Sequence, residues 1–221
     1  MSAHKICIID YGVGNIYSIK RAIRNAGFEP SLITDSVELK HAAGVILPGV
    51  GAFCEGMNKL KERGFVKPLQ KLAEAGVYIL GICLGMQLLY SQSEEFGVHK
   101  GLDIFPGNVV RIPMPPHDCL ERKLPHIGWK PLRPKNNKGF DGTILTYVQP
   151  EDEFYFMHTY TCVPKNDNHI LALTYYGINK FVAVVKHDNV YGCQFHPEKS
   201  REPGIAILRQ FLDLAGGRIN R

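Results

Sequence analysis

Long apolar runs are missing from this 221-residue chain. No stretch approaches the roughly 18 to 20 consecutive apolar residues that a membrane-spanning helix requires. The chain also enters a strand-like apolar segment at Lys5, almost at its start, without the pattern of an export signal. We therefore expect no membrane association and a cytoplasmic location.

Closely spaced cysteines are missing as well. There is no Cys-x-x-Cys pair, and no histidine cluster has the spacing of a zinc site. This pattern predicts free thiols in a reducing compartment, no metal centre and no cofactor. The six cysteines are Cys7, Cys54, Cys83, Cys119, Cys162 and Cys193.

Runs of basic residues are missing, although the chain carries 26 Lys and Arg against 21 Asp and Glu, a net charge of +5. Basic and acidic residues are interleaved, and no known nucleic-acid-binding motif is present. We interpret this as an ordinary solvated surface and expect no nucleic-acid partner. The alternative is a patch that faces an acidic partner or a phosphorylated substrate.

What the chain does contain is enough apolar sequence for a sizeable core, since 45% of its residues are hydrophobic. No repeat, low-complexity tract or long linker divides it, so we expect a single domain over residues 1–221. Short apolar runs alternate with amphipathic stretches in the first part, which is typical of a parallel sheet with crossover helices. Strands are predicted there at 5–10, 30–33, 44–47 and 78–82, and helices at 16–26 with Asn15 as the cap, 53–63, 66–75 and 84–91.

The second part changes to strands separated by Pro, Gly and Asn. Strands are predicted at 107–112, 154–160, 170–176, 181–187 and 190–194, and a final helix at 204–215. The segment 113–142 is expected to form exposed excursions around a short strand. The whole pattern predicts an α/β fold with a mostly parallel central sheet, flanking helices and additional antiparallel strands.

The strongest local signal is Gly81-Ile82-Cys83-Leu84-Gly85, where an apolar strand meets a helix. This is the G-x-nucleophile-x-G form, in which the two glycines let the backbone crowd around a sharply turned nucleophile. The nearby helix N-terminus favours the thiolate, which is the attacking species. The alternative is that Cys83 is a buried small apolar residue.

A matching base follows a later apolar strand, in Gln-Phe-His-Pro-Glu-Lys-Ser at residues 194–200. In an extended stretch, residues two apart point to the same side, so Glu198 can hold one ring nitrogen of His196 while the other faces the thiol. Nucleophile, base and orienting carboxylate form a triad. Alone, a His-Pro-Glu turn would indicate a surface loop, but beside the cysteine elbow it predicts Cys83, His196 and Glu198 as catalytic residues.

An oxyanion needs backbone donors. The N–H group of Leu84 is one candidate, because it begins the helix after the nucleophile. The loop Pro48-Gly49-Val50-Gly51 follows another apolar strand and is suited to turn its amides into the site, so we expect the second donor at Val50 or Gly51. The alternative is a plain turn from strand to helix.

These motifs resemble the class I, or triad-type, glutamine amidotransferases, and the resemblance covers essentially the entire chain. It rests on Gly-Ile-Cys-Leu-Gly-Met-Gln at residues 81–87 and on the His-Pro-Glu segment. The resemblance implies a flavodoxin-like fold and hydrolysis of the glutamine side-chain amide through a thioester on Cys83. It also implies that Gln87, Glu95 and Gly49 hold the substrate glutamine. The alternatives are an ordinary helix-face glutamine at Gln87 and a solvated acid at Glu95.

Within the family, the chain is most similar to glutaminase subunits of imidazole glycerol phosphate synthase. The similarity rests on residues 10–15, 47–53, 125–129 and 155–160, and Ile127, Lys130 and Thr159 depart from the usual Met, Asn and Ser. Trp129 could instead be a core aromatic residue and His158 a satisfied strand histidine. The resemblance places the following residues at the partner interface or the rim of the active site: Asn15, Pro125, His126, Trp129, His158 and Thr159.

A partner is expected because the chain has no G-x-x-x-x-G-K-[ST] phosphate loop and no second domain in which to activate an acceptor. The resemblance implies a heterodimer with a cyclase subunit that uses the ammonia to make imidazole glycerol phosphate and aminoimidazole carboxamide ribotide. A related glutaminase that supplies a sugar amidotransferase in surface-glycan synthesis is the main competing hypothesis. A cysteine peptidase or esterase would use the same elbow, and a non-catalytic docking subunit would use the fold alone.

Overall fold

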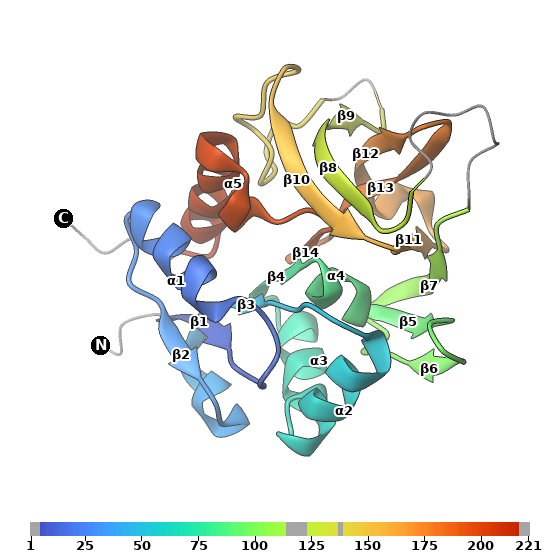
Figure 1. Cartoon of the computed structure of the whole chain (residues 1–221). Coiled ribbons are helices and arrows are strands. Elements are labelled where there is room, and N and C mark those ends of the chain that lie inside the picture. Colours follow the sequence, from blue (N-terminus) through green and yellow to red (C-terminus); the bar gives the residue numbers. More distant parts are fainter. Residues whose placement is uncertain (1–4, 114–122, 137–138, 217–221) are drawn as a thin grey trace.

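An eight-stranded sheet forms the centre of the molecule in the computed structural model, which describes residues 5–113, 123–136 and 139–216 (Figure 1). Its strand order is β2-β1-β3-β4-β14-β13-β12-β9. Pairing is parallel from β2 to β14 and antiparallel from β14 to β9. The strands, in this order, are Ser31–Ile33, Lys5–Ile9, Ala42–Leu47, Tyr78–Ile82, Val190–Cys193, Asn179–His187, Ile170–Tyr176 and Arg133–Pro134.

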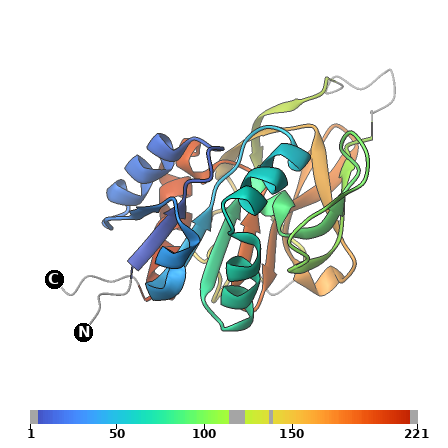
Figure 2. The same cartoon turned by 90° about the horizontal axis from the view of Figure 1, so that it is seen from below.

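Helices cover both faces of this sheet. Neighbouring residues of a strand point to opposite faces, so an apolar strand must be covered on both sides. Ile6 and Ile8 of β1 pack in one apolar cluster with α1 and α5, whereas Cys7 and Ile9 pack in another with α2 and α3. In Figure 2, the blue helix α1 and the red helix α5 lie together at the left, and the teal to green helices α2 and α3 lie apart from them. The helices are α1 (Ile16–Asn25), α2 (Phe53–Glu62), α3 (Val66–Glu74), α4 (Leu84–Leu88) and α5 (Arg201–Leu214), with 3-10 helices η1 (Ser36–His41), η2 (Asp167–His169) and η3 (Pro197–Lys199). The predicted α/β fold with flanking helices is confirmed.

In the part of the chain that the structure describes, two smaller sheets lie beside the central one, in the orders β11-β7-β5-β6 and β10-β8. The single strand predicted at 154–160 is wrong, since Thr159 separates two strands that belong to different sheets. The pairing partners decide this break, because β10 pairs with β8 and β11 pairs with β7. The strands are β5 (Tyr90–Ser93), β6 (His99–Lys100), β7 (Phe105–Arg111), β8 (His126–Pro131), β10 (Glu153–His158) and β11 (Tyr160–Pro164).

The helix predicted at 84–91 is also too long. It ends at Leu88, and the chain continues as strand β5, which pairs in parallel with β7. Tyr90 is fully buried and its ring stacks on Phe105 with centroids 5.7 Å apart. This tertiary contact, which the local sequence does not reveal, overrides the helical periodicity.

Other boundaries shift by a few residues. The final helix begins at Arg201, three residues before its predicted start, and β13 begins at Asn179. Within the segment 113–142, β8 spans six residues and its first residue is buried; residues 114–122 and 137–138 lie outside the described part of the chain.

The five cysteines that the structure describes are free, as predicted, and Cys119 lies outside the described residues. No helix in the described ranges is long and apolar enough to cross a membrane.

Candidate active site

Cys83 lies in a strained turn between β4 and α4, with φ 54° and ψ −111°. Its N–H group donates to the carbonyl of Cys193 at 2.7 Å, which ties the turn to β14. The flanking glycines permit close approach. A Cβ atom at Gly85 would collide with the carbonyl oxygen of Leu47, and one at Gly81 would lie 2.7 Å from the carbonyl oxygen of Gly85. The elbow expected from the sequence is therefore present in the backbone.

His196 and Glu198 reach the same sheet edge because β14 runs parallel to β4 and ends just before them. The ring nitrogen Nδ1 of His196 lies 2.8 Å from Oε1 of Glu198, and the two side chains are 2% and 1% exposed. The N–H group of His196 donates to the carbonyl of Tyr155 at 2.9 Å. The hydroxyl of Ser200 donates to the carbonyl of His196 at 2.7 Å, so the turn is held from both sides.

The second ring nitrogen of His196, Nε2, is buried, and no nitrogen or oxygen atom of the described residues bonds to it. Burial alone would lower the pKa of His196, but interaction with the Cys83 sulfur and with the Glu198 carboxylate outweighs it and raises the pKa. Both neighbours stabilise the protonated ring because each carries negative charge when ionised. The raised pKa makes the His196 ring a stronger base than an ordinary histidine.

A pocket of about 240 Å³ opens over these side chains. It is lined by the following residues that the sequence picked out: Val50, Gly51, Cys83, Leu84, Gln87, Glu95, Pro125, His158, Thr159 and His196. Residues Asn15, Gly49, His126, Trp129 and Glu198, also picked out from the sequence, do not line it. Segments far apart in the chain therefore converge on the cysteine.

The loop before α2 packs directly on the elbow. A Cβ atom at Gly49 would lie 2.9 Å from the backbone nitrogen of Gly85, so glycine is needed for this contact. The buried hydroxyl of Tyr11 donates to the carbonyl of Pro48 at 2.7 Å and anchors the loop. Leu84 is the first residue of α4, where helical N–H groups have no acceptor within the helix. Its amide is therefore available to an oxyanion, and the loop that contains Gly49 lies directly beside the elbow.

Comparison with known proteins agrees with this geometry. Residues 7–214 match the family described as Glutamine amidotransferase class-I. The chain belongs to the class-I glutamine amidotransferases. It is 43% identical over 211 residues to "Imidazole glycerol phosphate synthase subunit HisH 1" of Legionella pneumophila (strain Paris), covering 95% of this chain and 99% of the relative. It is 41% identical over 210 residues to the HisH subunit of Moorella thermoacetica, covering 95% and 94%.

Solved structures share the fold of this amidotransferase at low sequence identity. "Crystal structure of glutamine amidotransferase" has a TM-score of 0.70 at 19% identity and covers 95% of this chain and 98% of its own. "Structure of PurLQS from Thermotoga maritima" has a TM-score of 0.70 at 21% identity and covers 96% and 99%. These similarities support the class I amidotransferase fold.

The side-chain amide of Gln87 is oriented by two acceptors in this amidotransferase. Its Nε2 donates to the carbonyl of Tyr160 at 3.2 Å and to Oε1 of Gln194 at 3.1 Å. Because Gln194 accepts through its oxygen, its own nitrogen is free to donate to the Cys83 sulfur, 3.8 Å away. Gln194 stands at the head of the His-Pro-Glu segment, but the sequence assigns it no role, since its contacts join residues more than 100 positions apart.

Glu95 has a structural role in addition to lining the pocket. Its Oε2 accepts a hydrogen bond from the N–H group of Phe53 at 2.6 Å, at the start of α2. A carboxylate at a helix N-terminus stabilises the helix. The alternative of a freely solvated acid is therefore wrong for this amidotransferase, since the side chain holds the loop after residue 51 in place.

The residues expected at the rim differ in exposure. Asn15 caps α1 by accepting from the N–H group of Ser18 at 3.2 Å. His126 is fully buried and forms no surface. Trp129 is half-buried, and the Arg201 guanidinium lies 4.6 Å from its ring centre, so it is not a core aromatic residue. Only Asn15 and Trp129 of these three can meet a partner directly.

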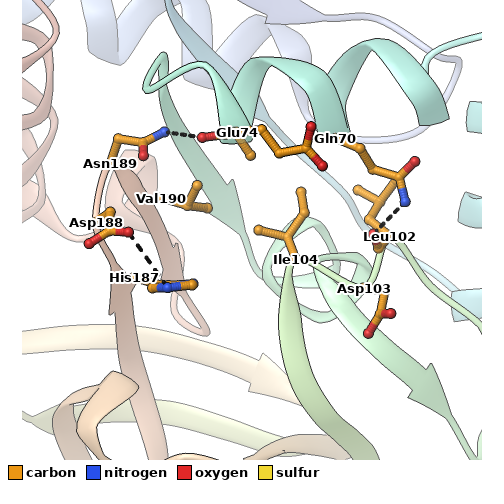
Figure 3. A pocket seen from close by; sticks show the side chains of 10 residues that line it. Gln70, Glu74, Leu102, Asp103, Ile104, His187, Asp188, Asn189 and Val190 are labelled. Atoms are coloured by element: carbon orange, nitrogen blue, oxygen red, sulfur yellow. Dashed lines mark hydrogen bonds and ion pairs between the residues drawn. The ribbon is translucent and has the colours of Figure 1, made fainter.

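A second pocket, of about 410 Å³, lies between α3, residues 102–104 and the turn between β13 and β14 (Figure 3). Its walls are tied together by two amides. Gln70 donates to the carbonyl of Leu102 at 2.9 Å, and Asn189 donates to the carbonyls of Ala73 and Val77 at 3.1 and 2.6 Å. None of the residues predicted from the sequence as functional lines this pocket.

Proposed function

We propose that the chain hydrolyses L-glutamine to glutamate and ammonia, with Cys83 as nucleophile, His196 as acid and base, and Glu198 as the orienting carboxylate. The observation that carries the proposal is the 2.8 Å contact between His196 Nδ1 and Glu198 at the strand edge that also holds the cysteine elbow. Membership of the class-I amidotransferase family supports the same chemistry.

The reaction begins when Nε2 of His196 takes the thiol proton and the Cys83 sulfur attacks the side-chain amide carbon of glutamine. The electron pair of the carbonyl moves to its oxygen. His196 then gives the proton to the amide nitrogen and the C–N bond breaks. Ammonia departs, and a thioester remains on Cys83. In the second half, His196 deprotonates a water molecule that attacks the thioester, glutamate leaves, and the thiol is restored.

The developing negative oxygen is stabilised by backbone donors, the N–H group of Leu84 on one side and that of Val50 or Gly51 on the other. These residues line the same pocket as Cys83. The N–H group of Leu84 is supported by its place as the first residue of α4. The loop donor is supported by the packing of Gly49 against Gly85.

Glutamine is held, in this proposal, by Gln87, Glu95 and the loop at Gly49. Both N–H groups of the Gln87 amide are used by protein acceptors, so its Oε1 is the atom left to accept from the substrate. One carboxylate oxygen of Glu95 accepts a hydrogen bond from the N–H group of Phe53, and the other can accept one from the substrate ammonium group. A buried amide with a fixed orientation selects a donor group in the ligand.

We further propose that the ammonia passes to a cyclase subunit in a cytoplasmic heterodimer, which makes imidazole glycerol phosphate and aminoimidazole carboxamide ribotide for histidine synthesis. Support comes from relatives at 41 to 43% identity that are named as subunits of imidazole glycerol phosphate synthase. The same names disfavour the surface-glycan alternative. The partner is expected to meet the chain beside Pro125, Trp129 and Thr159, and also at Asn15.

The test is glutamate release by the purified chain, with and without the cyclase and its ribotide substrate. We expect Cys83→Ala to lower kcat by at least about 10³-fold, since loss of a triad nucleophile removes most of the rate enhancement. Glu198→Gln should lower kcat by about 10² to 10⁴-fold with little change in KM. Cys54→Ala, which alters a half-buried cysteine on α2 outside the pocket, is the matched control.

Glutamate release that continues in Cys83→Ala would refute the proposed nucleophile. Ester hydrolysis without any glutamine hydrolysis would instead favour an esterase. If glutamine is hydrolysed but the cyclase neither binds the chain nor receives ammonia, the chemistry stands and the proposed partner is wrong.

A further inference from the structure

Two buried histidines form a hydrogen-bonded pair beside the candidate active site. His126 begins β8 and His158 ends β10, and the two residues are paired opposite each other in the antiparallel ladder. Nδ1 of His126 lies 3.0 Å from Nε2 of His158, and the residues are 0% and 6% exposed. His158 also lines the pocket that contains Cys83. The proposed glutaminase mechanism does not use this pair.

The protonation of the pair follows from its acceptors. Nδ1 of His158 lies 2.8 Å from the carbonyl oxygen of Tyr160, and a carbonyl only accepts, so Nδ1 carries the proton. Burial lowers the pKa of His158 to about 3, so the ring is neutral and its Nε2 is an acceptor. His126 must therefore donate from Nδ1. The hydrogen bonds run in one direction, from His126 to His158 to Tyr160.

The chain of hydrogen bonds ends at a residue of the substrate pocket. The carbonyl of Tyr160 accepts a second hydrogen bond, from Nε2 of Gln87 at 3.2 Å. This carbonyl is one of the two acceptors that orient the Gln87 amide; the other is Gln194. If the carbonyl turned away, Gln87 would lose one acceptor and its amide could rotate by half a turn, presenting nitrogen in place of oxygen.

We propose that His158, supported by His126, is a positioning residue for glutamine: it holds the Tyr160 carbonyl in place, and that carbonyl holds Gln87 with its oxygen toward the substrate. This proposal rests on the proposed glutaminase function and deepens it. His158 touches no reacting atom in this scheme. Its role is to set the affinity for glutamine, so its loss changes KM and binding more than the chemical step.

Two substitutions at one position test the proposal. In His158→Asn, the side-chain nitrogen can take the place of Nδ1 and keep the bond to Tyr160. In His158→Gln, the amide reaches the place of Nε2 and loses that bond. We expect His158→Gln to raise the glutamine KM by about tenfold, the size of one lost hydrogen bond, and kcat to change by less than about threefold. His158→Asn should restore KM to within about threefold of the unsubstituted chain.

The measurements are steady-state glutamate release by the full chain with its cyclase, and calorimetric binding of glutamine in the Cys83→Ala background. His169→Asn and His169→Gln are the matched controls, because His169 is a partly buried histidine that does not line the pocket. Both controls should leave KM unchanged.

Equal KM values in the two His158 variants, or a loss of active enzyme with KM and affinity unchanged, would overturn the positioning role and leave a purely structural one. Absence of glutamine binding and hydrolysis in the unsubstituted chain would instead refute the proposed function itself. The two failures are thus distinguishable.

Discussion

Because the backbone at Cys83 is strained, we predict that the Cys83→Gly variant is more stable than the Cys83→Ala variant. With φ 54° and ψ −111°, the residue occupies a region that side chains with a Cβ atom rarely adopt. Such strain costs of order 1 to 3 kcal/mol. Cys83→Ala keeps the Cβ atom and the strain, whereas Cys83→Gly removes both. Neither variant retains a thiol, so the two differ only in the Cβ methyl group and in the backbone freedom that its removal allows.

The expected difference follows from three contributions. Strain relief favours glycine by about 2 kcal/mol. The larger conformational entropy of glycine in the unfolded chain offsets about 0.8 kcal/mol, and loss of one buried methyl group offsets about 0.8 kcal/mol more. Cys83→Gly is therefore expected to be about 0.5 kcal/mol more stable than Cys83→Ala.

The control is Ala75→Gly at the exposed end of α3, where φ is −79° and no strain is released. There, glycine should cost about 0.5 to 1 kcal/mol. The contrast between the two sites is then about 1 to 1.5 kcal/mol, or roughly 3 °C in Tm for a chain of this size. Urea unfolding followed by circular dichroism measures it. If replacing alanine by glycine lowers the free energy of unfolding as much at position 83 as at position 75, the reasoning is refuted.

Three further outcomes are expected. Because burial lowers the pKa of His158 to about 3, the unfolded chain binds a proton that the folded chain cannot, and stability falls as the pH drops below about 6.5, by about 1.4 kcal/mol per unit. His158→Asn should reduce the slope of urea stability between pH 7 and 5, and an unchanged slope would contradict this. Tyr11→Phe, which leaves a buried carbonyl without its donor at 2.7 Å, should cost about 1 to 3 kcal/mol in thermal unfolding. Tyr90→Phe should cost less, because no nitrogen or oxygen of the described residues bonds the Tyr90 hydroxyl and the Cys162 sulfur beside it is only a weak hydrogen-bond partner; equal costs would argue against the hydrogen-bond explanation. Gln194→Met removes a donor 3.8 Å from the Cys83 sulfur and should slow alkylation of that thiol by iodoacetamide by about three- to tenfold at neutral pH, followed by mass spectrometry. An unchanged rate would show that the contact does not stabilise the thiolate.

Local patterns are sufficient where neighbours in the chain decide the structure. The strands 78–82 and 170–176 have the bounds that the sequence predicts, since each is an apolar run between breaking residues. The cap of α1 at Asn15 is predictable for the same reason. The elbow is predictable from its glycines, because any residue with a Cβ atom at position 85 would collide with the backbone of Leu47.

Pairing between distant strands cannot be predicted from local patterns. The helix predicted at 84–91 is too long because β7 offers a partner for Tyr90–Ser93, and the strand predicted at 154–160 is broken at Thr159 because its halves pair with different strands. In both places the hydrogen bonds come from strands that the local sequence does not reveal, and these outweigh the intrinsic preference of the segment.

The sequence by itself determined which chemical groups this amidotransferase has and, through apolar periodicity and glycine placement, the strand edges that carry Cys83 and His196. Only the tertiary structure decided what those groups touch. The contact of His126 with His158 joins residues 32 positions apart, and that of Gln87 with Gln194 joins residues 107 positions apart. A hydrogen bond depends on distance and direction in space, and only the folded chain brings such residues within about 3 Å of each other.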